Sequence, residues 1–223
     1  MKLRALAFMI AAVALGGCVD NMASGTLDPV VGDAGWKPRD KDLMSNLPYN
    51  QAAVSETYRR HVVEYHRKEA PGTVLIDSDN KFLYYVMPRG KAIRYGVAVG
   101  EEAQAWSGLA KVGRMEEWPA WIPTPGEQQR LGPLPAFVTG GPHNPMGARG
   151  MYLFVANRDT LYRIHGTNQP EYIGSAVSSG CIRMTNEDVI DLYNRVKIGT
   201  PVVVLAPHPG LFSLASSAGS NSY

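Results

Sequence analysis

Short runs rich in aliphatic and aromatic residues, many of them bounded by turn residues, recur along much of the chain, and this pattern predicts β-strands. The runs expected to form strands are 73–77, 81–87, 91–99, 151–156, 161–165 and 201–205. Turn residues at Ser78-Asp79-Asn80 and Pro88-Arg89-Gly90 separate the first three runs, as in a β-meander. The last run is apolar throughout, which is typical of a buried strand. The pattern therefore predicts a mainly β domain with a curved sandwich or barrel-like sheet.

Two segments have apolar residues spaced by three or four positions, which predicts short helices. The first covers 51–69, with Val54, Tyr58 and Val62 on one face, and ends before a proline and a glycine. We expect this segment, as part of an extension over 51–72, to pack against the edge of the domain. The second helix is expected over 186–196, with Thr185 as its N-cap and Asp188 reaching back to it.

Prolines and glycines crowd the stretch 106–150, which argues against long regular elements there. Ordered loops of this length are usually functional or act as lids. We expect this loop to form the roof of a cleft.

The first 18 residues have the character of an export signal. Lys2 and Arg4 give a charged start, 6–15 is apolar, and two glycines precede Cys18. The apolar part is too short to span a bilayer. The end of this segment resembles the bacterial lipobox, in which the chain is cut before the cysteine and the sulfur of that cysteine is acylated. The alternative is an ordinary secretory signal cut nearby, which would leave Cys18 discarded or as an ordinary thiol.

Beyond this signal, 19–50 is rich in turn-forming and polar residues and is expected to be a flexible tether. The Ser-rich end, 207–223, is expected to be a disordered tail. The part between them suffices for one domain of ordinary size, since domains are typically about 100–150 residues.

The composition excludes some classes of function. The chain of 223 residues is 45% hydrophobic and 19% charged, as in a soluble globular protein. Its formal net charge is only +2, and no run of five or six basic residues supplies a local patch. We therefore expect no nucleic-acid partner.

The chain has two cysteines, Cys18 and Cys181. If Cys18 carries lipid, Cys181 is an unpaired thiol in an oxidising compartment, where such thiols usually serve a chemical purpose. Two alternatives are a disulfide between the two cysteines and a buried, inert Cys181.

The residues around Cys181 form a pattern suited to nucleophilic catalysis. His165-Gly166-Thr167-Asn168 ends a predicted strand, and Ser178-Ser179-Gly180-Cys181-Ile182-Arg183-Met184 precedes a predicted helix. A thiol attacks as its thiolate and needs a nearby imidazole to accept its proton. Cys181 and His165 can supply this pair. The backbone amides of Gly180 and Cys181 are candidates for an oxyanion hole.

This pattern resembles the signature of the L,D-transpeptidase catalytic domains of the YkuD type. Further similar segments place the resemblance over about 73–206; they are Gly90 to Tyr95, Trp106-Ser107-Gly108, Gly140 to Pro145, Gly147-Ala148-Arg149 and Gly199 to Val202. Some members of that family have a second histidine before the Gly-Cys pair, where this chain has Ser179.

The resemblance implies roles for individual residues. The backbone carbonyl of Gly166 would orient His165, so that no aspartate is needed. Arg183 would bind a substrate carboxylate, and a structural ion pair is the alternative. Other residues expected near the substrate are Thr167, Asn168, Ser178 and His143. We expect no metal, because ligand spacings are missing, and no cofactor.

By the same resemblance, the expected reaction is attack of Cys181 on a peptidoglycan stem tetrapeptide, with release of D-alanine and transfer of the acyl group to an amine. The amine could belong to a second stem, to a lysine of a wall-attached protein or to a free D-amino acid. Two other functions remain open: an L,D-carboxypeptidase or amidase that uses the same residues, and a non-catalytic wall-binding module.

The expected location is the periplasm, on a membrane through the lipid anchor. Val19, rather than aspartate, follows Cys18. This favours the outer over the inner membrane.

Overall fold

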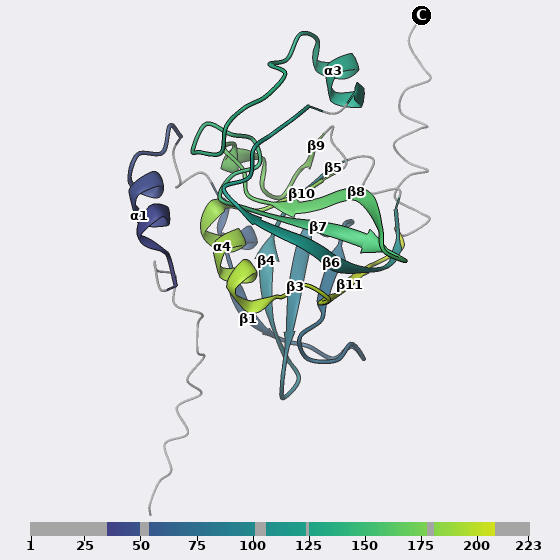
Figure 1. Cartoon of the computed structure of the whole chain (residues 1–223). Coiled ribbons are helices and arrows are strands. Elements are labelled where there is room, and N and C mark those ends of the chain that lie inside the picture. The colour runs from purple at the N-terminus through teal and green to yellow at the C-terminus, as the bar shows by residue number, and fades with distance from the viewer. Residues whose placement is uncertain (1–34, 50–53, 101–105, 124, 178–180, 208–223) are drawn as a thin grey trace, which may run out of the picture.

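The computed structural model describes residues 35–49, 54–100, 106–123, 125–177 and 181–207, and most of them lie in or between β-strands (Figure 1). The strands are β1 (His61–Glu64), β2 (Val74–Asp77), β3 (Phe82–Met87), β4 (Lys91–Gly96), β5 (Ala98–Gly100), β6 (Gly108–Glu117), β7 (Arg149–Val155), β8 (Arg158–His165), β9 (Ala176–Val177), β10 (Ile182–Arg183) and β11 (Pro201–Val204). The helices are α1 (Pro38–Ser45), α3 (Pro125–Leu131) and α4 (Asn186–Arg195), with 3-10 turns η2 (Glu56–Tyr58) and η3 (Pro170–Tyr172). The prediction of a mainly β domain with short helices is confirmed.

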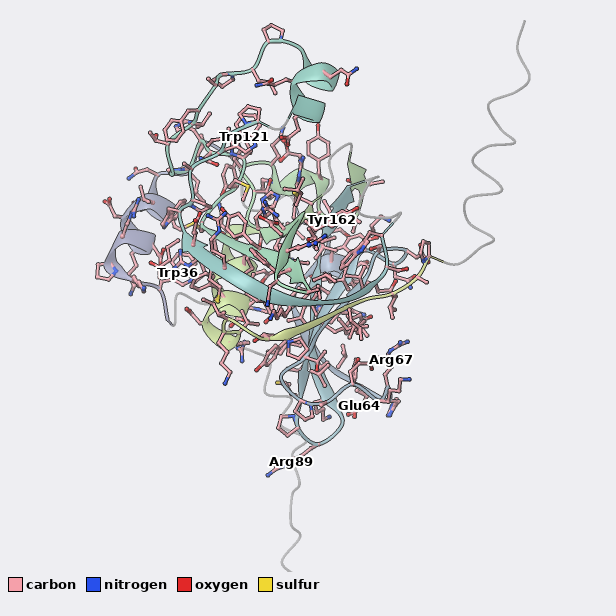
Figure 2. All side chains as sticks on the ribbon, turned by 45° about the vertical axis from the view of Figure 1, so that its right-hand side comes forward. Trp36, Glu64, Arg67, Arg89, Trp121 and Tyr162 are labelled. Carbon is pink, nitrogen blue, oxygen red and sulfur yellow. The ribbon has the colours of Figure 1, made fainter. Side chains whose placement is uncertain are left out.

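These strands form one hydrogen-bonded sheet in the order β1-β4-β3-β2-β11-β6-β7-β8-β10-β5-β9. The sheet bends on itself, so that β3 and β4 run behind and across the direction of β6, β7 and β8 (Figure 1). β11 joins the two parts, since it pairs in parallel with β2 and antiparallel with β6. In Figure 2 the β3–β4 hairpin with Arg89 lies at one end of the molecule, and the loop with Trp121 lies at the other.

The core fills the space between the two parts of the sheet and α4. Its members are fully buried aliphatic and aromatic side chains, among them Ile76, Leu83, Tyr95, Met151, Leu153, Ile164, Ile190 and Leu192. α4 begins as expected, with the Oγ1 of Thr185 accepting a hydrogen bond of 3.2 Å from the amide of Asp188. This cap places Val189, Ile190 and Leu192 against the sheet.

The helix predicted over 51–69 is wrong. Within its described part the chain forms the turn η2 and then the edge strand β1, which pairs with β4. Tyr58 packs its ring against Gly174, where a Cβ would lie 2.1 Å from the ring. Val62 pairs with Ile93. The helical spacing thus reflects two separate contacts, and the hydrogen bonds offered by β4 together with two β-branched valines favour a strand.

The expectation of no long regular element in 106–150 is also wrong for its first part. β6 spans Gly108–Glu117 and pairs with both β7 and β11. The prolines begin only at Pro119, so they do not interrupt this strand.

The predicted tether, 19–50, ends earlier than expected, because 35–49 is folded against the domain. Met44 of α1 is buried in the core, and Trp36, Leu43 and Leu47 pack against it. Asp40 of α1 forms a buried ion pair with Arg149 at the start of β7. The predictions for 1–34, which include Cys18, and for 208–223 lie outside the described residues.

Candidate active site

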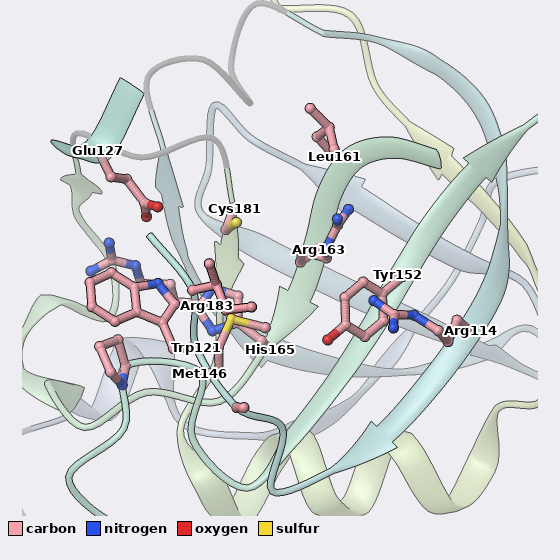
Figure 3. Close-up of a pocket in the computed structure, with 13 residues that line it drawn as sticks. Arg114, Trp121, Glu127, Met146, Tyr152, Leu161, Arg163, His165, Cys181 and Arg183 are labelled. Atoms are coloured by element: carbon pink, nitrogen blue, oxygen red, sulfur yellow. The ribbon is translucent and has the colours of Figure 1, made fainter. Parts of the chain in front are cut away.

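The pairing of β8 with β10 brings His165 and Cys181 to the same face of the sheet. The two strands are parallel, with Ile182 beside Ile164 and Arg183 beside His165. Both isoleucines are buried in the core, at 3% and 1% exposure. Side chains alternate along a strand, so His165, Cys181 and Arg183 face the opposite side, where a cleft lies (Figure 3).

His165 is held by a backbone carbonyl. The Nδ1–H of the neutral ring donates to the carbonyl oxygen of Gly166 over 2.6 Å, the contact that the family resemblance implied. This hydrogen bond fixes the tautomer, because it leaves Nε2 as the acceptor. The ring is only 4% exposed and borders the cleft. The orientation of the ring in the cleft is thus fixed.

Gly166 is itself fixed by a close-packed cluster around Asn186. The amide of Gly166 donates to the carbonyl of Arg149 over 3.0 Å, and the Oδ1 of Asn186 accepts from the amide of Ala148 over 2.8 Å. A Cβ on Gly166 would lie 2.2 Å from that Oδ1. The Nδ2 of Asn186 donates to the hydroxyl of Tyr49, in the N-terminal segment. The supporting role of Asn186 was not predicted from the sequence, where the only signal was its place at the first turn of α4.

The electrostatics of the site favour a neutral resting pair. Burial, and then the nearby charge of Arg183, lower the pKa of His165 to about 3. Cys181 is partly exposed to the cleft, yet the protein encloses it closely enough that burial raises the pKa of its thiol to about 11. The charges of Arg163 and Arg183 oppose that rise without cancelling it. Both pKa shifts favour the neutral forms, a thiol and an uncharged imidazole, in the same cleft.

A cleft of about 300 Å³ surrounds this pair (Figure 3). Its lining residues are Arg114, Ala120, Trp121, Ile122, Glu127, Pro145, Met146, Tyr152, Leu161, Arg163, His165, Cys181 and Arg183. Six of them, from Ala120 to Met146, come from the long loop before β7. The loop expected to cover a cleft thus supplies part of its wall.

Asn144 holds this loop in shape. Its side chain is fully buried, and its Nδ2 donates to the carbonyls of Pro119, Val138 and Thr139 over 3.2, 3.0 and 2.9 Å. Its Oδ1 accepts from the amide of Met146 over 2.8 Å. Because Met146 borders the cleft, this one side chain connects the base of the loop to the wall of the site.

The predicted substrate contacts are distributed unevenly. Arg183 lines the cleft. Thr167 is 1% exposed, and its Oγ1 accepts from the amide of Gln169, so it shapes the turn after His165. Asn168 donates to the carbonyl of His143 over 3.1 Å, and His143 is exposed outside the cleft lining. Ser178 and Gly180 lie outside the described residues, so the proposed oxyanion hole stays a prediction.

The cleft also contains arginines and aromatic residues that the sequence analysis did not select. Register places Tyr152 beside Arg163 and Arg114 beside Tyr152, so the three side chains form a row across β6, β7 and β8. Trp121 and Met146 add apolar walls. The alternation along β8 that placed His165 in the cleft would also have placed Arg163 there.

Among the residues that the structure describes, no helix is both long and apolar enough to cross a bilayer. No group of three or more histidine, cysteine or acidic side chains in the same part of the chain is arranged to hold a metal ion.

Comparison with known proteins finds one family model, the L,D-transpeptidase catalytic domain, which matches residues 71–204. The probable L,D-transpeptidase ErfK/SrfK of Escherichia coli K12 is 37% identical over 132 residues, which cover 55% of this chain and 40% of that protein. The probable L,D-transpeptidase YbiS of the same strain is 36% identical over 139 residues, 59% of this chain and 43% of that one. The chain thus spans less than half the length of these relatives. A crystal structure described as a probable carnitine operon oxidoreductase caia from Brucella melitensis is 46% identical, with 70% of this chain and 99% of that chain covered and a TM-score of 0.47.

Proposed function

This chain belongs to the family of L,D-transpeptidase catalytic domains, and on that premise we propose that it transfers acyl groups between peptidoglycan stem peptides and amines through a thioester on Cys181. The observation that carries the proposal is the joint placement of Cys181 and His165 in one cleft, with the ring oriented by the Gly166 carbonyl. The relatives' names support the reaction class.

The first half of the proposed reaction forms the thioester. The sulfur of Cys181 attacks the carbonyl carbon of the amide between a diaminopimelate-type residue and the terminal D-alanine, while Nε2 of His165 takes the thiol proton. The amide of Cys181, together with that of Gly180, would stabilise the oxyanion. Collapse breaks the C–N bond, and the imidazolium returns its proton to the departing amine of D-alanine.

The second half transfers the acyl group. An amine attacks the thioester carbonyl, and His165 accepts a proton from this amine. The sulfur leaves as thiolate and regains that proton, which restores the neutral pair. The cleft needs no charged resting state for this cycle, because each proton moves only as the corresponding bond forms or breaks.

We also propose a lipid-anchored periplasmic location, with Cys18 as the acylated residue. It rests on the composition of residues 1–18 and on Val19. Radiolabelled palmitate incorporated into the full chain, and lost in Cys18→Ala, would support it, whereas equal labelling of both would contradict it.

Mass spectrometry of residues 19–223 incubated with disaccharide tetrapeptides tests the proposed reaction. We expect loss of D-alanine, an acyl adduct on Cys181 and a dimeric product, with all three missing in Cys181→Ala. A tripeptide product without dimer would instead indicate an L,D-carboxypeptidase. A folded protein with a reduced thiol but no adduct would favour a wall-binding module.

A further inference from the structure

Two arginines border the thiol from different directions. Arg183 lies on β10, two residues after Cys181, and its charge interacts with that of Glu127 in α3. Arg163 lies on β8, and Figure 3 shows it on the side of Cys181 that faces Tyr152, away from Glu127 and Trp121. The cleft therefore offers a guanidinium on each side of the position where the thioester would form. If the carboxylate of the donor binds Arg183, as the family resemblance implies, Arg163 remains for a second ligand.

Arg163 is held in a fixed position. Its Nη1 and Nη2 donate to the two carboxylate oxygens of Asp159 over 2.8 and 3.1 Å, and Nη1 also donates to the carbonyl of Tyr162 over 3.1 Å. Its Cζ lies 4.5 Å from the centre of the Tyr152 ring. Among the residues that the structure describes, these hydrogen bonds use three of the five N–H groups of the guanidinium and leave two for a ligand. The side chain is 15% exposed and borders the cleft.

Tyr152 is held just as firmly beneath these arginines. Its hydroxyl donates to Glu116 over 2.7 Å, and the Cζ of Arg114 lies 3.6 Å from its ring centre. Arg114 is paired with Glu116 at 2.7 Å. The ring is thus stacked with two guanidiniums, each of which already has a carboxylate partner. A site of this kind needs little rearrangement when a ligand binds, which lowers the entropic cost of binding.

The paired charges indicate the class of ligand. Because each of the two guanidiniums is paired with a carboxylate, the row has little net charge, which suits a zwitterion better than a polyanion. An α-amino acid carries its amine and its carboxylate on one carbon. If the carboxylate binds the two N–H groups of Arg163 that Asp159 and Tyr162 leave open, the amine of the same molecule can face Cys181, which borders the same cleft.

We propose that Arg163 binds the carboxylate of the acyl acceptor, so that this enzyme selects amines that bear a carboxylate on the same carbon. Such acceptors are free D-amino acids and the amino acid end of a diaminopimelate side chain, whereas a lysine side chain of a protein lacks the neighbouring carboxylate. The inference rests on the proposed function, because it assigns the acceptor of the same reaction. Arg163 is a specificity residue here and takes no part in proton transfer.

A comparison of the transfer rates to two acceptors tests the proposal. Residues 19–223 are incubated with the tetrapeptide donor and with either D-methionine or D-methioninol, in which a hydroxymethyl group replaces the carboxylate. The rate of transfer to each is measured by mass spectrometry, together with the acyl adduct on Cys181. We expect the wild type to prefer D-methionine by at least about tenfold, because hydrogen bonds to charged groups are the strong ones.

Variants at two arginines of β8 separate recognition from folding. Arg163→Gln should lose most of the preference for D-methionine, Arg163→Lys should retain part of it, and both should still form the adduct. Arg158→Gln is the matched control, since Arg158 is exposed on the same strand and outside the cleft lining; it should behave as the wild type.

Three results would overturn the inference. Equal transfer to both acceptors by the wild type would show that the carboxylate is not recognised. An unchanged preference for D-methionine in Arg163→Gln would assign Arg163 a structural role. So would a transfer rate that falls by the same factor for both acceptors. Failure of the wild type to form any adduct is a different outcome, because it would remove the proposed function itself.

Discussion

Asp40 and Arg149 form a buried bidentate ion pair. Nη1 and Nη2 of the guanidinium lie 2.8 and 2.6 Å from the two carboxylate oxygens. Their exposures are 1% and 0%. Burial alone would raise the pKa of Asp40, but hydrogen bonds from Arg149, the Lys37 amide and Trp118 hold it below its usual value. Arg149 lies in the part that matches the family, and Asp40 precedes that part. The ion pair thus joins the N-terminal segment to the strand whose start supports Gly166.

Asp40→Ala should destabilise the fold by about 3–5 kcal/mol, because it leaves the charge of Arg149 buried without a partner. The measurement is urea unfolding of residues 19–223. Asp42→Ala, an exposed position on the same helix, should cost less than about 0.5 kcal/mol. Equal effects of the two substitutions would show that the ion pair contributes nothing particular.

Gly166→Ala should slow acylation of Cys181 by roughly a hundredfold, a loss of the size that small misplacements of catalytic groups produce. The added methyl group would meet Oδ1 of Asn186 at 2.2 Å. It would therefore displace the carbonyl that orients His165. Gly141→Ala is the control, since a Cβ there meets no atom within 4 Å. Normal acylation by Gly166→Ala, measured by mass spectrometry, would refute this account.

The thiol of Cys181 should react slowly with iodoacetamide at neutral pH. With its pKa raised by burial to about 11, the thiolate fraction grows about tenfold for each pH unit up to that value. Residues 19–223 contain no other cysteine, so the alkylation rate reports on Cys181 alone. Denatured protein should show the inflection near the ordinary value of 9.0 instead. A native rate that is already constant from pH 6 upward would indicate a preformed thiolate and imidazolium.

His165 should make the fold less stable in acid. Its pKa is 6.5 in the unfolded chain and about 3 in the folded one, so between these values the unfolded state binds more protons. The free energy of unfolding should therefore fall by about 1.4 kcal/mol per pH unit from this group as pH drops below 6.5. His165→Gln removes the effect, so the stability difference between it and the wild type should change with pH. Parallel curves from pH 7 to 4 would contradict the assignment.

The sequence predicts those elements best whose local pattern and tertiary contacts agree. The strands from Val74 to Gly100 are rich in apolar residues that the core buries, and the cap at Thr185 is a local hydrogen bond. The segment 51–69 misleads because Tyr58 and Val62 make unrelated contacts, with Gly174 and with β4, that happen to be four residues apart. A pattern cannot distinguish one buried face from two separate contacts.

The residues of the candidate site also fall into those that the sequence predicts and those that it does not. His165, Gly166 and Cys181 lie in a continuous signature, so the residues themselves suggested the chemistry. Asn186 and Asp40 act through partners that are distant in sequence, and pattern alone does not reveal such partners. Arg163 lies two residues before His165 on the same face of β8. That placement became meaningful only once the register with β7 and β10 was known.

The raised pKa of the Cys181 thiol has a consequence for the chemical durability of the protein. Peroxides and disulfides attack thiolates far more readily than thiols. A thiol whose pKa is raised by burial, as that of Cys181 is, should therefore react slowly with oxidants. By enclosing Cys181 and raising the pKa of its thiol, the walls of the cleft should also slow oxidation of that sulfur.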